Sequence, residues 1–76
     1  MSARSAQMLP PKMAAQFAER VKRGEGHRVS PNSEMYEFPQ GGNVIVLMDI
    51  NQPFGHVVRD PRRAQALRDI ESGAKK

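Results

Sequence analysis

Apolar side chains recur at helical spacing near the start of this 76-residue chain. Met13, Phe17 and Val21 follow one another every four residues, and most of the positions between them are polar or small. Residues four apart lie on one face of an α-helix. The stretch opens with a proline, which is tolerated in a first helical turn, and Gly24 interrupts the pattern. The spacing therefore predicts an amphipathic helix over residues 11–23.

A second helical pattern occupies the end of the chain. Asp60-Pro61 is typical of a helix start, because Asp caps free backbone N–H groups and Pro suits the first helical position. Leu67 and Ile70 then keep the helical period. This pattern predicts a helix over residues 61–72.

Between the two helices the pattern changes to that of β-strands. Residues 35–38 predict a short strand, and the Gly41-Gly42 pair is typical of a tight turn. Residues 43–50 predict the strongest strand, which contains the longest apolar run, Val44 to Met48, and residues 56–59 predict a third, short strand. The resulting order, α-β-β-(β)-α, predicts a small single α+β domain. We expect an antiparallel hairpin or meander with both helices packed on one face.

The strand over residues 43–50 carries large apolar side chains on both faces. Val44, Val46, Met48 and Ile50 share one face, whereas Ile45 and Leu47 share the other. If both helices cover one face, the other set stays exposed, and an exposed apolar face is typical of a binding surface. Association with a second copy is the simplest way to cover it. The prediction is therefore a homodimer or protein-partner interface, made by Ile45, Leu47, Tyr36 and Phe38.

The size and composition of the chain limit what it can hold. With 76 residues and no Cys, the chain is too short for a multidomain enzyme and forms no disulfide. Two His and no thiol make a structural zinc site improbable, so we expect neither metal nor cofactor. We expect a disordered N-terminal tail over residues 1–8, one domain over 9–74 and a frayed end at 75–76.

Charge is distributed unevenly along the chain, whose formal net charge is +4. Residues 1–30 and 59–76 are basic, whereas residues 31–58 contain no Lys or Arg. The simplest interpretation is that helix surfaces carry solubilising charge. The alternative is contact with an anion or a nucleic acid, through the start of the C-terminal helix and the basic end of the first helix. The residues concerned are Arg59, Arg62, Arg63, Lys22 and Arg23.

The α-β-β-β-α order is also that of double-stranded RNA-binding domains, an analogy of element order alone. Against a nucleic-acid function, the chain has no Trp and one Tyr, and the central strands carry no basic side chain. The nucleic-acid hypothesis therefore stays the alternative to protein binding.

Side chains with catalytic potential are few. His56 is the best candidate for acid–base chemistry, but no spacing supplies the partner that would orient it. Gly41-Gly42 is too short to hold a phosphate, and no paired carboxylates or metal-ligand spacings occur. We therefore expect no catalytic residues, no small-molecule substrate and no enzymatic activity.

The sequence contains no apolar run near the ~20 residues of a membrane helix. Its N-terminus lacks the apolar stretch of a secretory signal. We expect a cytoplasmic protein without membrane contact. The hypothesis from sequence is a small regulator or inhibitor that binds another protein and itself.

Overall fold

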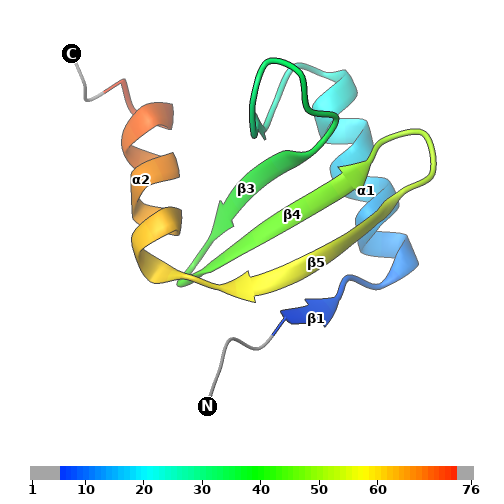
Figure 1. Cartoon of the computed structure of the whole chain (residues 1–76), viewed down its shortest axis with the longest axis horizontal. Helices are drawn as coiled ribbons and strands as arrows, with labels where there is room; N and C mark the ends of the chain where they lie inside the picture. Colours follow the sequence, from blue (N-terminus) through cyan, green and yellow to red (C-terminus); the bar gives the residue numbers. More distant parts are fainter. Residues whose placement is uncertain (1–5, 74–76) are drawn as a thin grey trace.

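Residues 6–73 are described by the structure, a computed structural model, and they form one antiparallel sheet with two helices (Figure 1). The elements in chain order are β1 (Ala6–Met8), α1 (Pro11–Lys22), β2 (His27–Arg28), β3 (Tyr36–Gln40), β4 (Asn43–Asp49), β5 (Phe54–Arg59) and α2 (Pro61–Glu71). The strands lie in the order β1-β5-β4-β3-β2. The predicted α+β class with an antiparallel sheet is confirmed.

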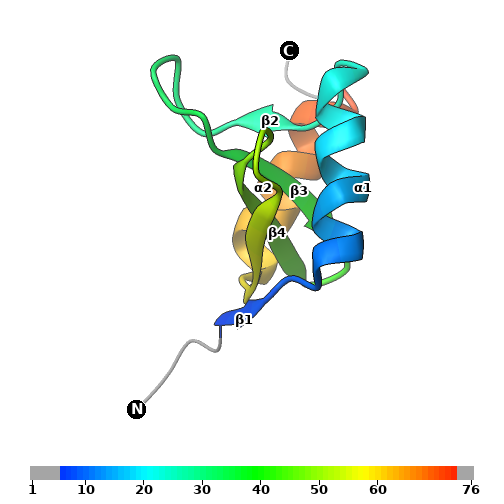
Figure 2. The same cartoon turned by 90° about the vertical axis from the view of Figure 1, so that its right-hand side faces the viewer.

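The two helices pack on opposite faces of this sheet. Ile45 and Leu47 of β4 belong to the core beneath α1, whereas Val44 belongs to a second core with Ala64 and Leu67 of α2. Successive residues of a strand point to opposite sides, so these contacts place the helices on different faces. Figure 2 shows α1 lying along one side of the sheet. The expectation that both helices share one face is wrong, because each apolar set of β4 receives its own helix.

Helix α1 follows from its apolar stripe. Ala14, Phe17, Ala18 and Val21 are buried against the sheet, as the four-residue spacing predicted. Leu9, two residues before the helix, is buried in the same core. The helix thus supplies four of the eight buried residues of the larger core.

Helix α2 begins where the sequence predicted. The carboxylate of Asp60 accepts a hydrogen bond from the backbone N–H of Arg63 at 3.0 Å, and Pro61 occupies the first helical position. Only Ala64 and Leu67 of this helix are buried, while Ile70 is 60% exposed. The helix therefore has a well-capped N-terminus but buries few side chains against the sheet.

The hairpin of β3 and β4 is longer than the sequence indicated. β3 continues through Pro39 to Gln40, which pairs with Asn43 across the two-residue turn, and Gly41 of that turn has a positive φ of 59°. Pro39 is tolerated because β2 pairs only with the first two residues of β3, which leaves Pro39 on a free edge.

Two short strands were not predicted. β1 pairs antiparallel with β5, so residues 6–8 belong to the sheet and not to the expected disordered tail. The rest of that tail, residues 1–5, and the frayed end expected at 75–76 lie outside the described residues. β2 falls between the predicted helix over residues 11–23 and the predicted strand over residues 35–38, where no element was expected. The observed order β-α-β-β-β-β-α removes the analogy with double-stranded RNA-binding domains.

An irregularity near the end of β4 changes the facing of the residues after it. The pairing with β5 shifts register between Leu47 and Asp49, which indicates a β-bulge. Beyond this point Ile50 packs against the core under α1. The prediction that Ile50 shares a face with Val44 and Val46 is therefore wrong.

Candidate binding surface

The residues predicted to form an exposed interface lie in the core under α1. Ile45 and Leu47 are 0% exposed, and Phe38 is 2% exposed. Tyr36 is half-buried at the margin of the same core, where Arg28 lies over its ring and donates a hydrogen bond to its hydroxyl at 3.2 Å. The predicted interface is therefore wrong, because α1 covers the face on which these side chains lie.

An open apolar surface exists on the opposite face instead. In the strand register His56 stands between Met8 of β1 and Val46 of β4, and Val58 lies two residues further along β5. Phe54 shares this side, since its ring meets the His56 ring edge-on at 5.3 Å. Met8 is 64% exposed and Phe54 42% exposed, and the other three are partly exposed. We call these five residues the open patch.

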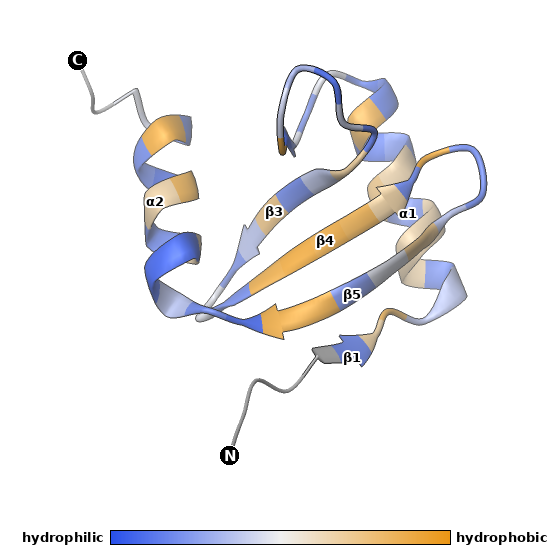
Figure 3. Ribbon diagram, viewed as in Figure 1, coloured by the Kyte–Doolittle hydropathy of each residue, from blue (hydrophilic) through white to orange (hydrophobic). Residues whose placement is uncertain are grey.

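The position of α2 explains why this patch is uncovered. The helix packs chiefly on β3 and β4, near the turn that joins them, and leaves the β5 and β1 side of the face without helical cover (Figure 1). In Figure 3 the same view shows hydrophobic colouring along β4 and at the end of β5. The open patch contains no charged side chain except His56 when it is protonated. It is therefore an apolar area on a basic protein.

His56, the candidate for acid–base chemistry, has no hydrogen-bonded carboxylate beside its ring within residues 6–73. Neither Asp49 nor Asp60 forms a hydrogen bond or ion pair with its ring within residues 6–73, and its nearest aromatic neighbour is Phe54. A general base needs a group that orients its imidazole and a site for substrate. The side chain instead contributes an amphipathic ring to the open patch.

Arg63, one of the predicted anion contacts, is held within the molecule. Its guanidinium binds the Glu37 carboxylate of β3, with 2.6 Å between Nη2 and Oε1. Hydrogen bonding to Glu37, followed by its Coulomb attraction, raises the pKa of Arg63 above its ordinary value. Glu37 has a largely buried side chain, so this pair fastens α2 to β3 and leaves Arg63 with little capacity for an external anion.

The other predicted basic residues do not form one surface. Arg59 and Arg62 are exposed and make no ion pair with any residue from 6 to 73. Lys22 and Arg23 each pair with a nearby glutamate, at 3.5 and 3.6 Å. Figure 1 places the end of α1 and the start of α2 at opposite ends of the molecule. The five residues are therefore divided between two separate places.

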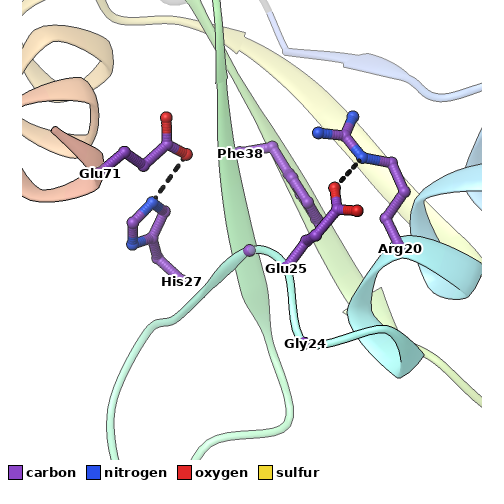
Figure 4. A pocket seen from close by; sticks show the side chains of 7 residues that line it. Arg20, Gly24, Glu25, His27, Phe38 and Glu71 are labelled. Carbon is purple, nitrogen blue, oxygen red and sulfur yellow. Dashed lines mark hydrogen bonds and ion pairs between the residues drawn. The ribbon is translucent and has the colours of Figure 1, made fainter.

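A pocket that the sequence did not predict opens at the C-terminal ends of the two helices (Figure 4). Its volume is about 420 Å³, and it is lined by Arg20, Gly24, Glu25, Gly26, His27, Phe38 and Glu71. Its charged groups are paired with each other. Arg20 donates to Glu25 at 2.7 Å, and the His27 ring nitrogen lies 2.9 Å from the Glu71 carboxylate.

Two contacts at this pocket join distant segments of the chain: His27 with Glu71, and Arg20 with Phe38. The Arg20 guanidinium lies over the rings of Phe17 and Phe38, at 5.1 and 4.9 Å from their centroids. The hydrogen bond from Arg20, with the attraction of Arg20 and Arg23, lowers the pKa of Glu25. Pairing between residues 44 positions apart, as in His27 and Glu71, leaves no signal in a single sequence. We interpret the pocket as a junction between segments.

No protein-family model matches the sequence, and neither a curated protein nor a solved structure shows significant similarity to the chain. Across residues 6–73, no helix has the length and apolar character needed to cross a membrane. The same residues contain no group of three or more His, Asp or Glu placed to hold a metal ion. Among residues 6–73, the open patch is thus the surface whose geometry indicates a function.

Proposed function

We propose that this protein is a non-catalytic binding module, a regulator or inhibitor, that recognises a protein partner through the open patch. The observation that carries the proposal is the exposure of Met8 and Phe54 next to His56, on the part of the sheet face that α2 leaves uncovered. Exposed apolar clusters on small proteins mark interaction sites, and aromatic residues and Met are enriched at the centres of interfaces.

The chemistry of the patch favours protein over nucleic acid. None of its five residues is Lys or Arg, whereas nucleic-acid binding depends on basic side chains that neutralise phosphates. Met side chains are flexible and adapt to an apolar partner surface. A second copy of the chain is one such partner, because two identical patches without Asp, Glu, Lys or Arg can meet without repulsion between those side chains.

The test for a protein partner is affinity capture from the native cell at low and at moderate salt, with analysis of both protein and nucleic acid. The comparison uses wild type, Phe54→Gln in the patch, and Ile70→Gln on α2 as the matched control, since Ile70 is also an exposed apolar side chain. We expect a protein that is retained at moderate salt, lost with Phe54→Gln and kept with Ile70→Gln. Capture of nucleic acid that disappears with salt, or equal capture by both variants, would overturn the proposal.

Self-association is tested separately by sedimentation at micromolar concentration. A homodimer formed by the patch has twice the 8.5 kDa mass of the chain and returns to 8.5 kDa with Phe54→Gln. A wild-type species of 8.5 kDa would exclude the homodimer, and a dimer that survives Phe54→Gln would place its interface elsewhere.

A further inference from the structure

The two helices are attached to the sheet very unequally. Eight residues are buried in the core that contains α1, among them Phe17, Phe38, Ile45 and Leu47. The core beneath α2 contains three buried residues, Val44, Ala64 and Leu67. Leu67 is thus the only large apolar side chain of α2 that is buried, because Ile70 faces solvent. Most of the hydrophobic stabilisation of the fold therefore lies on the α1 side.

The remaining contacts of α2 are polar and lie at its surface. Arg63 binds Glu37, Glu71 binds His27, and Arg68 donates to the carbonyl of Gly41. The side chains of Arg63 and Glu71 are each more than 40% exposed, whereas those of their partners Glu37 and His27 are 14% and 18% exposed. Ion pairs with one solvent-exposed member are weakened by water, so these contacts fasten α2 to the sheet less firmly than a large buried core would.

The surface beneath α2 is continuous with the open patch. Val44, which α2 buries, stands directly opposite Val58 of the patch in the strand register, and Val46 of the patch packs against the same small core. Moving α2 away from the sheet would therefore join Val44 to the patch in one larger apolar face. The α1 core would be untouched, because its side chains point to the other side of the sheet.

We infer that α2 is a displaceable cover: it leaves the sheet as a unit while the sheet and α1 stay folded, and its departure uncovers Val44 beside the open patch. Elements with few buried contacts open below the free energy of global unfolding. An isolated helix of this length is marginal in water, so α2 loses its helical hydrogen bonds when it undocks. Opening of α2 would enlarge the proposed binding surface, but the evidence for opening is the packing of α2 and does not depend on the proposed function.

Thiol labelling tests this inference directly, because the chain contains no cysteine. Val44→Cys places one thiol beneath α2, and Ile45→Cys, the matched control, places one beneath α1. Both native side chains are almost fully buried. We expect a thiol reagent to label Val44→Cys at least about tenfold faster than Ile45→Cys, since only the former is released by α2 opening. Equal rates, or faster labelling of Ile45→Cys, would overturn the inference.

Hydrogen exchange of the full chain provides the second test. Ile45→Val weakens the α1 core, so it accelerates exchange in β4 by roughly 2- to 10-fold through global unfolding. It should leave exchange in α2 unchanged, because α2 opens without disturbing Ile45. Leu67→Ala should accelerate α2 exchange at least about 30-fold, which distinguishes undocking from fraying of the helix end.

Two exchange results would contradict the inference. The first is that the amides of α2 and β4 exchange equally slowly and that Ile45→Val accelerates both to the same extent. That result would mean that α2 opens only when the whole molecule unfolds. The second is fast α2 exchange that Leu67→Ala does not change. Neither result bears on capture of a partner by the open patch, so failure of this inference and failure of the proposed function are distinguishable.

Discussion

Two glycines after α1 have nearly the same backbone conformation but different surroundings. Gly24 has a φ of 93° and nothing near the position of a Cβ atom. Gly26 has a φ of 89°, and a Cβ there would lie 2.7 Å from the Cζ atom of Phe38. Positive φ favours glycine at both positions. Only Gly26 also allows the loop to approach the aromatic ring at the margin of the core.

This difference predicts unequal effects of alanine. Gly24→Ala should lower the free energy of unfolding by about 1–2 kcal/mol, from the backbone alone. Gly26→Ala should lower it further, by about 1–3 kcal/mol, because the methyl group collides with Phe38. Urea denaturation of the two variants measures the difference. Equal losses would show that Phe38 yields to the methyl group without strain.

A single carboxylate in the same loop predicts a pH effect. The hydrogen bond from Arg20 lowers the pKa of Glu25 below its ordinary value of 4.5. A carboxyl with a lowered pKa adds stability that is present above its unfolded pKa and lost as pH falls through its folded pKa. Glu25→Gln should therefore lower the urea midpoint at neutral pH, and the difference from wild type should vanish below that folded pKa.

The control for this effect is Glu34→Gln, which removes an exposed carboxylate that pairs with no Lys, Arg or His within residues 6–73. Its urea midpoint should follow that of wild type at every pH. A Glu25→Gln midpoint that differs from wild type by the same amount at neutral and acid pH would mean that the Arg20 pair has no part in stability.

At the scale of elements, the two faces of β4 differ in burial and therefore in their contribution to stability. Leu47 is fully buried under α1, whereas Val46, its neighbour, belongs to the open patch. Leu47→Ala should lower the free energy of unfolding by about 2–5 kcal/mol, because it leaves a cavity in the core. Val46→Ala should cost about 1 kcal/mol or less, since that side chain stays partly in water. Chemical denaturation of both variants checks the order, and a larger loss from Val46→Ala would contradict the assignment of the faces.

Both helices could be predicted from the sequence, because their signals are local. The spacing of Phe17 and Val21 and the Asp60-Pro61 start lie within single elements, and the structure confirms them. The face that each helix covers could not be predicted, because both apolar sets of β4 can accept a helix. The strands β1 and β2 were missed for a related reason: three and two residues are too few to show alternation, and their pairing partners are distant in the chain.

The predicted interface of Ile45, Leu47, Tyr36 and Phe38 was wrong, and the open patch was not predicted. The prediction assumed that both helices cover one face of β4, whereas each face has its own helix. Met8, the most exposed member of the patch, lay in the segment expected to be disordered. The basic residues were predicted as one group because sequence shows charge but not distance, and the pairing of Arg63 with Glu37 depends on a long-range contact.

At the scale of the whole molecule, the chain has one sealed face and one partly open face. The sealed face, under α1, contains most of the buried apolar side chains. The other face is divided between α2 and the open patch. One side of the sheet therefore supplies most of the buried apolar packing, and the other carries the open patch that we propose as the binding surface.

The most direct test of this account is the accessibility of methyl groups to a soluble paramagnetic probe, measured by NMR on the free protein. If one sheet face is sealed by α1 and the other is partly open, the probe should strongly broaden the methyl signals of Met8, Val46 and Val58. The methyl signals of Ile45 and Leu47 should be unaffected. Broadening of Ile45 and Leu47 with protection of Met8 and Val58 would contradict it, because the open face would then be the one assigned to α1.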